Sequence, residues 1–280
     1  MIPAAFSYRR AASVEDALAA IASGDAKVIA GGQSLLPLMK LRLASPGALV
    51  DIGRLSELRT FGPTADGGYE VGALVTYAEI LGSTIPGIAR ECLEGIGDVQ
   101  VRNRGTVGGA FSHADPASDL PALAIALDYS FVLRSTRGER TVPADGFFQG
   151  PFQTLMEPDE LFIKGVRPAL PAGANGAYRK LAQPASGYSI VGVAAVVAMS
   201  GGTVSHARVA LTGVHEHAYR APEVEAALVG TDGSADAVRA AAEHATVGVE
   251  INSDIHADAA YRKAMAAVYT QRALDAALGR

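Results

Sequence analysis

Two apolar runs joined by a short polar turn constrain the fold of this chain more than any other feature. The runs cover 190–199 and 204–212, and Ser200-Gly201-Gly202-Thr203 lies between them. Both runs contain many β-branched residues, and a glycine-containing turn between such runs is typical of a hairpin. The first run has about half of the ~20 residues that a membrane-spanning helix needs. We therefore expect an antiparallel pair of strands in the C-terminal part of a globular protein.

Helical and strand patterns also occur upstream of this hairpin. The apolar pattern favours strands over 27–30, 49–52 and 69–74. Helices are expected over 13–24, 35–43 and 87–96. Thr76 and Glu79 have the spacing of a capping box at a helix start. Residues 98–119 are dense in glycine, proline and polar residues with few periodic apolar positions, which predicts a long, irregular and functional loop.

A change of composition divides the chain. Residues 168–176 are rich in Pro, Gly and Ala, which is typical of a domain boundary. After the hairpin, residues 222–278 are rich in Ala and favour helices. We therefore predict an α+β protein with one domain over 1–173 and a second over 174–280, since 280 residues are enough for two buried cores.

Charge and cysteine content exclude several functions. The net charge is −5 and the charges are mixed along the chain, which argues against a nucleic-acid-binding surface. The single cysteine, Cys92, cannot supply the four thiolates that an iron–sulfur cluster usually requires, and its helical surroundings favour a buried, unreactive thiol. The N-terminus has neither the basic start nor the apolar core of a secretory signal. We expect a soluble, cytoplasmic protein without an integral membrane segment.

Two glycine-rich segments are candidates for cofactor binding. Ala30-Gly31-Gly32-Gln33-Ser34 follows a predicted strand, and Gly105-Thr106-Val107-Gly108-Gly109 lies in the predicted loop. Glycine permits positive φ and close approach of a ligand, and successive backbone N–H groups can bind a diphosphate without a lysine. Neither G-x-G-x-x-G nor G-x-x-x-x-G-K-[ST] occurs, so a nucleotide would need another architecture. Either segment alone could also be a simple turn.

The sequence around these segments resembles a known family. The motifs are Ala30-Gly31-Gly32-Gln33-Ser34-Leu35-Leu36-Pro37, Val101-Arg102-Asn103-Arg104-Gly105-Thr106-Val107-Gly108-Gly109, His113-Ala114-Asp115-Pro116 and Asp119-Leu120-Pro121. They resemble those of the flavoprotein (medium) subunits of the molybdenum hydroxylases, which include aerobic carbon monoxide dehydrogenase and the FAD domain of xanthine dehydrogenase. The similarity extends to Ile2–Phe6 and Ala260–Arg262. It implies an FAD domain of the vanillyl-alcohol-oxidase (PCMH) type, followed by a small α+β domain with an antiparallel sheet and a helical bundle.

The resemblance also implies a site for non-covalent FAD. The implied cofactor-binding residues are Lys27, Val28, Ile29, Ala30, Gly31, Gly32, Gln33, Ser34, Leu35, Ile96, Thr106, Gly108, Gly109, Asp119, Phe162, Lys180 and Tyr188. The Asp119 carboxylate would accept hydrogen bonds from sugar hydroxyls, Phe162 would pack near the flavin, and Tyr188 would lie beside the isoalloxazine ring. Many members carry Gly-Asp before that last position, where this chain has Pro184-Ala185-Ser186-Gly187. This departure leaves the terminal acceptor open among NAD, quinone and oxygen.

In complexes of this family, a large subunit with the molybdenum cofactor oxidises the substrate, and a small subunit with two [2Fe-2S] clusters passes the electrons on. The resemblance implies that this chain is the FAD-containing oxidoreductase subunit, with no catalytic residue of its own. The usual assembly is a dimer of heterotrimers, that is, a heterohexamer. A free-standing flavin oxidase of the same fold is the alternative, and a nucleotide-binding regulatory module is a non-enzyme alternative.

A few other polar residues could carry chemistry. His113 and Asp115 have no third partner in the sequence pattern, and His215-Glu216-His217 lacks the helical H-E-x-x-H spacing, so we predict no metal site. Arg102 and Arg104 could neutralise a diphosphate, contact a partner or lie in a solvated loop.

Overall fold

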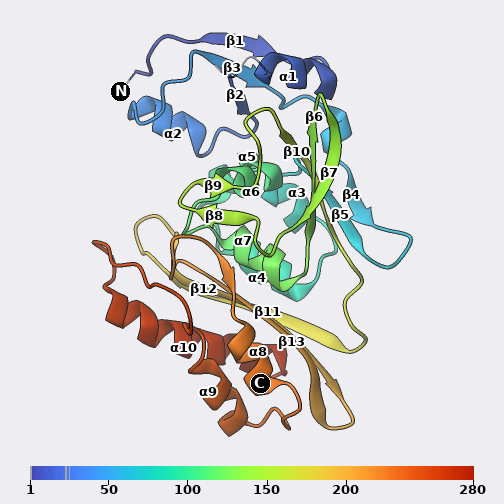
Figure 1. Ribbon diagram of the computed structural model, residues 1–280, viewed down its shortest axis with the longest axis vertical. Coiled ribbons are helices and arrows are strands. Elements are labelled where there is room, and N and C mark those ends of the chain that lie inside the picture. Colours follow the sequence, from blue (N-terminus) through green and yellow to red (C-terminus); the bar gives the residue numbers. More distant parts are fainter. Residues whose placement is uncertain (1, 23, 25) are drawn as a thin grey trace.

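The computed structural model describes residues 2–22, 24 and 26–280. Three parts follow one another along its longest axis (Figure 1). They are a small N-terminal sheet with its helices, a central part built on a five-stranded sheet, and a C-terminal sheet with helices.

The N-terminal part is a parallel three-stranded sheet in the order β1-β3-β2. Its elements are β1 (Ser7–Arg10), α1 (Val14–Ile21), β2 (Ala26–Ile29), α2 (Leu35–Lys40), β3 (Ala48–Asp51) and the 3-10 helix η1 (Ser56–Leu58). The Ser13 side chain caps α1 by accepting a hydrogen bond from the Asp16 backbone. The two strands expected here are confirmed as β2 and β3. Helix α2 is shorter than expected, because Arg42 takes a left-handed backbone conformation at φ 58°.

The central part has an antiparallel sheet in the order β4-β5-β10-β6-β7. Its elements are β4 (Phe61–Pro63), β5 (Tyr69–Gly72), α3 (Tyr77–Leu81), α4 (Gly87–Glu94), α5 (Val99–Arg104), α6 (Val107–His113), α7 (Asp119–Ala126), β6 (Ser130–Ser135), β7 (Gly138–Pro143), β8 (Phe148–Gly150), β9 (Gln153–Thr154) and β10 (Leu161–Arg167). The capping box of Thr76 and Glu79 is confirmed at the start of α3.

The prediction of a long irregular loop over 98–119 is wrong, because α5 and α6 occupy most of it. Asp98 caps α5 by accepting a hydrogen bond from the Val101 backbone, and Thr106 caps α6. Val107 and Phe111 of α6 are buried in the core. Capping and core packing together therefore stabilise helices that show little apolar periodicity.

The C-terminal part has an antiparallel sheet in the order β11-β12-β13-β14. Its elements are β11 (Ala174–Ala182), β12 (Ser189–Ser200), β13 (Thr203–Thr212), β14 (Tyr219–Arg220), α8 (Pro222–Leu228), α9 (Ala235–Ala242) and α10 (Ala259–Ala277). The predicted hairpin is confirmed as β12 and β13. Alternate residues of β12 belong to different clusters, since Ala194 and Val196 join the core of the central part while Val193 and Val197 join the core beneath α8–α10. The apolar run is continuous because both faces of this sheet are buried.

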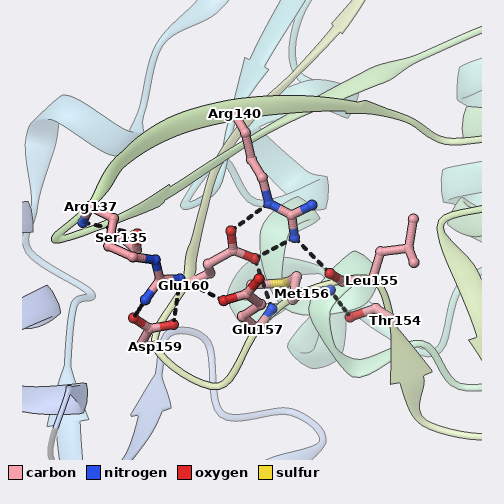
Figure 2. A network of polar contacts seen from close by, with 9 residues as sticks. All are labelled: Ser135, Arg137, Arg140, Thr154, Leu155, Met156, Glu157, Asp159 and Glu160. Carbon is pink, nitrogen blue, oxygen red and sulfur yellow. Dashed lines mark hydrogen bonds and ion pairs between the residues drawn. The ribbon is translucent and has the colours of Figure 1, made fainter.

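Charged residues brace the central sheet. Arg140 binds the buried carboxylate of Glu160 at 2.6 Å, and Arg137 binds Glu157 at 2.6 Å and also Asp159. Figure 2 shows these contacts. The Arg140 hydrogen bonds hold the pKa of Glu160 below its usual value. The network therefore joins the β6–β7 hairpin to the segment that leads into β10.

Within the described ranges, none of the helices combines the length and apolar character that a membrane span needs.

Candidate functional site

The first glycine-rich segment forms the turn between β2 and α2. Gly32 has φ +76°, a conformation that favours glycine. A Cβ on Gly31 would lie 1.8 Å from the carbonyl oxygen of Arg104, which is the last residue of α5. The turn therefore touches the start of the second glycine-rich segment, and the structure brings the two motifs together.

The backbone of this turn has unused hydrogen-bond donors. Among the described residues, the N–H groups of 31–35 donate to no protein acceptor, whereas those of Leu36 and Leu38 donate to carbonyls of the turn. All of these positions except Gln33 and Leu36 are at least partly buried. Successive free N–H groups at a helix start form a concavity that suits a phosphate or diphosphate. The residues of this turn therefore fit the diphosphate of a dinucleotide.

The second glycine-rich segment differs from the expected open loop. The N–H groups of Val107 and Gly108 donate to the carbonyls of Val75 and Ala73, at 3.0 and 2.9 Å, and the N–H of Gly109 donates to the Thr106 hydroxyl at 3.2 Å. A Cβ on Gly108 would lie 2.7 Å from the Cβ of Ala73. Gly108 is thus needed for close packing of α6, and the N–H groups of 107–109 are already satisfied by the protein.

The two arginines before this segment have different environments. The Arg102 guanidinium donates to the carbonyls of Ile96 and Gly97, both at 2.9 Å, so it stabilises the turn between α4 and α5. Arg104 is exposed and makes no ion pair with any residue the structure describes. Of the alternatives for this pair, only Arg104 keeps a side chain that is free for an anion or a partner.

Asp119 lies at the centre of a buried polar cluster. Its carboxylate accepts hydrogen bonds from the Tyr178 hydroxyl at 2.6 Å and the Ser189 hydroxyl at 2.7 Å. It also forms an ion pair with Lys180 at 2.7 Å, in which the two side chains are 5% and 9% exposed. A carboxylate has about four acceptor directions, so the protein uses most of them and leaves about one for a ligand hydroxyl.

The surroundings of this cluster keep its phenols and thiol protonated. Burial and the Asp119 carboxylate raise the pKa of Tyr178 well above its usual value, so this hydroxyl remains a donor. Burial also raises the pKa of the Cys92 thiol, which is fully buried in α4, as expected. Tyr77 is buried beside the second glycine-rich segment, and burial raises its pKa as well. Neutral groups thus surround a single compensated ion pair.

Two turns place three further candidate residues near one another. Lys180 of β11 donates to the Gly95 carbonyl at 3.0 Å, and a Cβ on Gly187 would lie 3.7 Å from the Gly97 nitrogen. The turn that contains Ile96 therefore lies against the β11–β12 turn that contains Tyr188. Tyr188 is 44% exposed, and partial burial raises the pKa of its hydroxyl.

The other candidates from the sequence are buried, as Phe162 is, or lie in β2, at the edge of the N-terminal sheet. Phe162 is 4% exposed and packs against Phe111 and Phe131, with ring centroids 5.5 and 5.2 Å apart. Phe162 therefore offers little accessible surface to a cofactor. In β2, which leads into the glycine turn, Lys27 is exposed while Val28 and Ile29 are half-buried.

Sequence reasoning missed two of the residues that bind Asp119. Tyr178 and Ser189 lie in β11 and β12, and only their hydroxyl contacts reveal a role. Tyr178 and Lys180 are two residues apart on one strand, so they share a face. That spacing was the one available signal, since Lys180 was already a candidate.

Two of the histidines contact other groups of the protein. The His113 ring packs against Phe152 at 5.0 Å, and burial lowers its pKa. The ring nitrogen Nδ1 of His215 lies 2.6 Å from the Glu250 carbonyl oxygen. In the part of the chain that the structure describes, no group of three or more His, Cys, Asp or Glu side chains could hold a metal ion.

Comparison with known proteins agrees with this geometry. Residues 4–168 match the family described as the FAD binding domain in molybdopterin dehydrogenase, and residues 176–277 match the CO dehydrogenase flavoprotein C-terminal domain. The chain is 43% identical to the carbon monoxide dehydrogenase medium chain of Hydrogenophaga pseudoflava, over 100% of this chain and 99% of that one. It is 38% identical to the glyceraldehyde dehydrogenase medium chain of Sulfolobus acidocaldarius, over 98% of each.

Comparison of the fold with solved structures indicates the same family. The solved structure of carbon monoxide dehydrogenase from Hydrogenophaga pseudoflava superposes with a TM-score of 0.96 at 44% identity, covering 100% of this chain and 99% of that chain. With both matched domains in the same order and over nearly the whole length, the chain belongs to the family of FAD-binding medium subunits of the molybdenum hydroxylases.

Proposed function

We propose that this chain binds FAD non-covalently and passes electrons from the [2Fe-2S] clusters of a small subunit to an external acceptor. The observation that carries the proposal is the row of free backbone N–H groups over residues 31–35, within a chain that matches medium chains along its whole length. When bound, FAD would supply the redox chemistry, because the isoalloxazine ring accepts and releases electrons.

The residues of this chain would bind and orient the cofactor. The free N–H groups of 31–35 would donate to the diphosphate, and the Thr106 hydroxyl, which accepts from Gly109, still has its own proton to donate. Asp119 would use its remaining acceptor direction for a sugar hydroxyl. Lys180 and Tyr188 would lie at the flavin, with the Lys180 charge compensated by Asp119. None of these roles requires a catalytic acid, base or nucleophile.

We infer non-covalent attachment from the residue types in the two glycine-rich segments. A covalent link to flavin uses a His, Cys or Tyr side chain, and neither glycine-rich segment contains one. Cys92 is fully buried. Acid precipitation of the purified protein should release all of its yellow colour, and flavin that stays with the pellet would contradict this assignment.

Partners would carry the other redox centres. A chain with one cysteine cannot bind an iron–sulfur cluster with four thiolates, so the clusters would lie on a small subunit and the molybdenum cofactor on a large subunit. We expect a carbon monoxide dehydrogenase-like complex, supported by 43% identity to such a medium chain. The complex would be a cytoplasmic dimer of heterotrimers.

We also propose that this chain divides into two domains, 1–173 and 174–280. The boundary lies between the two matched ranges.

The free-standing flavin oxidase is less well supported, because the relatives that cover nearly all of this chain are named as medium chains or subunits. Anaerobic mixing separates the two functions. The purified chain should hold FAD, with an absorbance band at about 450 nm, and substrate should bleach this band only after the small and large subunits are added. Rapid bleaching in this chain alone would favour the oxidase. Absence of flavin from the folded chain would contradict both the electron-transfer subunit and the oxidase. The nucleotide-binding regulatory module would then be the remaining alternative.

A further inference from the structure

Among the described residues, every group that binds the Asp119 carboxylate comes from the C-terminal part. Tyr178 and Lys180 lie in β11, and Ser189 begins β12. The matched FAD-binding domain ends at residue 168, so this site is completed from outside that domain. The ends of the C-terminal strands must therefore stay in register with Asp119.

The same strand ends also bind the backbone just before Asp119. The Thr212 hydroxyl lies 2.9 Å from the Pro116 carbonyl and 2.8 Å from the Ser118 carbonyl, and the Gly213 N–H donates to Pro116 at 2.9 Å. The Ser189 N–H donates to the carbonyl of residue 117 at 3.2 Å. The start of β12 and the end of β13 therefore act together on the 116–119 segment.

Arg262 of α10 joins these two strand ends. Its Nη1 donates to the carbonyl of Ile190, at 2.7 Å, and to that of Gly213. These two residues directly follow Ser189 and Thr212 in the sequence. Nη2 donates to Asp254 at 2.6 Å, and Arg262 as a whole is 3% exposed.

A buried guanidinium at this position is costly for stability. Its counter-ion Asp254 is 47% exposed, and among the described residues its Nε is buried without a hydrogen-bond partner. An arginine gives several donors in a rigid planar fork, which a lysine ammonium cannot reproduce. Arg262 binds the two carbonyls on neighbouring strand ends and the Asp254 carboxylate at the same time.

We propose that Arg262 is a positioning residue of the FAD site. It fixes the start of β12 and the end of β13, so that Ser189 and Thr212 hold the 116–119 segment and orient the Asp119 carboxylate toward the cofactor. This role rests on the proposed function, since it is expressed through FAD. It makes α10, the last helix of the chain, part of the cofactor site.

The test compares Arg262→Lys with Arg208→Lys in the full chain. Arg208 also joins a C-terminal strand to carboxylates, those of Asp128 and Glu225, but it contacts none of the residues around Asp119. FAD affinity and the visible flavin spectrum are measured on refolded, FAD-free protein titrated with FAD, together with thermal unfolding. Arg262→Lys should raise the Kd for FAD about ten-fold and shift the flavin band, while Arg208→Lys should change the Kd less than about two-fold.

A double substitution separates positioning from general destabilisation. If Arg262 acts through Ser189, the change in Kd for Arg262→Lys with Ser189→Ala should be smaller than the product of the single changes. An unchanged Kd in Arg262→Lys, or single effects that simply multiply, would overturn the proposal. If Arg262→Lys does not fold, Asp254→Asn removes the charged partner of the guanidinium instead. The Kd of this variant for FAD should then rise as well. A wild-type Kd in Asp254→Asn would also overturn the proposal. Wild-type protein that folds but never binds FAD would instead overturn the proposed function, and the role of Arg262 with it.

Discussion

Gly31→Ala is the sharpest test of the contact between the two glycine motifs. The added Cβ would lie 1.8 Å from the Arg104 carbonyl oxygen and 2.8 Å from its carbon, both backbone atoms that cannot rotate away. Gly31 does not have a positive φ, so the variant probes this contact alone. The β2–α2 turn and the end of α5 must therefore separate.

The size of the effect follows from overpacking. Inserting a methyl group into a close contact costs about 1–3 kcal/mol, which corresponds to roughly 5- to 150-fold in an equilibrium constant. Because the displaced turn carries the free N–H groups of 31–35, most of this cost should appear in the Kd for FAD. Quenching of flavin fluorescence on titration measures the Kd, and thermal unfolding shows whether the variant is folded.

Gly87→Ala is the matched control. Gly87 begins α4, has no positive φ, and a Cβ there would meet nothing within 4 Å. Alanine favours a helix by about 1 kcal/mol over glycine, so this variant should be at least as stable as wild type and bind FAD normally. A folded Gly31→Ala protein with wild-type FAD affinity would refute the diphosphate position.

Three further outcomes are expected. Gly108→Ala would place a Cβ 2.7 Å from the Cβ of Ala73, so it should lower the free energy of unfolding by about 1–3 kcal/mol, and an unchanged thermal midpoint would contradict the packing role. Asp119→Ala leaves a largely buried ammonium without its partner, so urea unfolding should show a loss of about 3 kcal/mol together with weaker FAD binding; full stability would show that solvent reaches the cluster. The pKa of Glu160 is lowered by Arg140, so its carboxylate stabilises the fold above the unfolded pKa of about 4.3 and this contribution is lost as pH falls through the folded pKa. Glu160→Gln should therefore be less stable than wild type at neutral pH, with a gap that narrows in acid, and a gap that widens in acid would be inconsistent with this sign.

Local signals in the sequence were enough for several elements. The capping box of Thr76 and Glu79 and the hairpin around 200–203 depend on contacts within a few residues, so their patterns predicted them correctly. The motifs around the glycines were also sufficient to indicate the family and its cofactor. The helices α5 and α6 were missed, because their stability depends on caps and on the packing of 107 and 111 against distant strands.

What the sequence by itself determined is the chemistry available: glycine turns for a diphosphate, one carboxylate at 119, and too few thiolates for a cluster. Only the tertiary structure decided how those groups are used. It engages the N–H groups of 107–109 within the protein and leaves those of 31–35 free, and it surrounds Asp119 with Tyr178, Lys180 and Ser189. The reason is physical, since a buried carboxylate needs donors, and here they come from strands that the chain reaches more than fifty residues later.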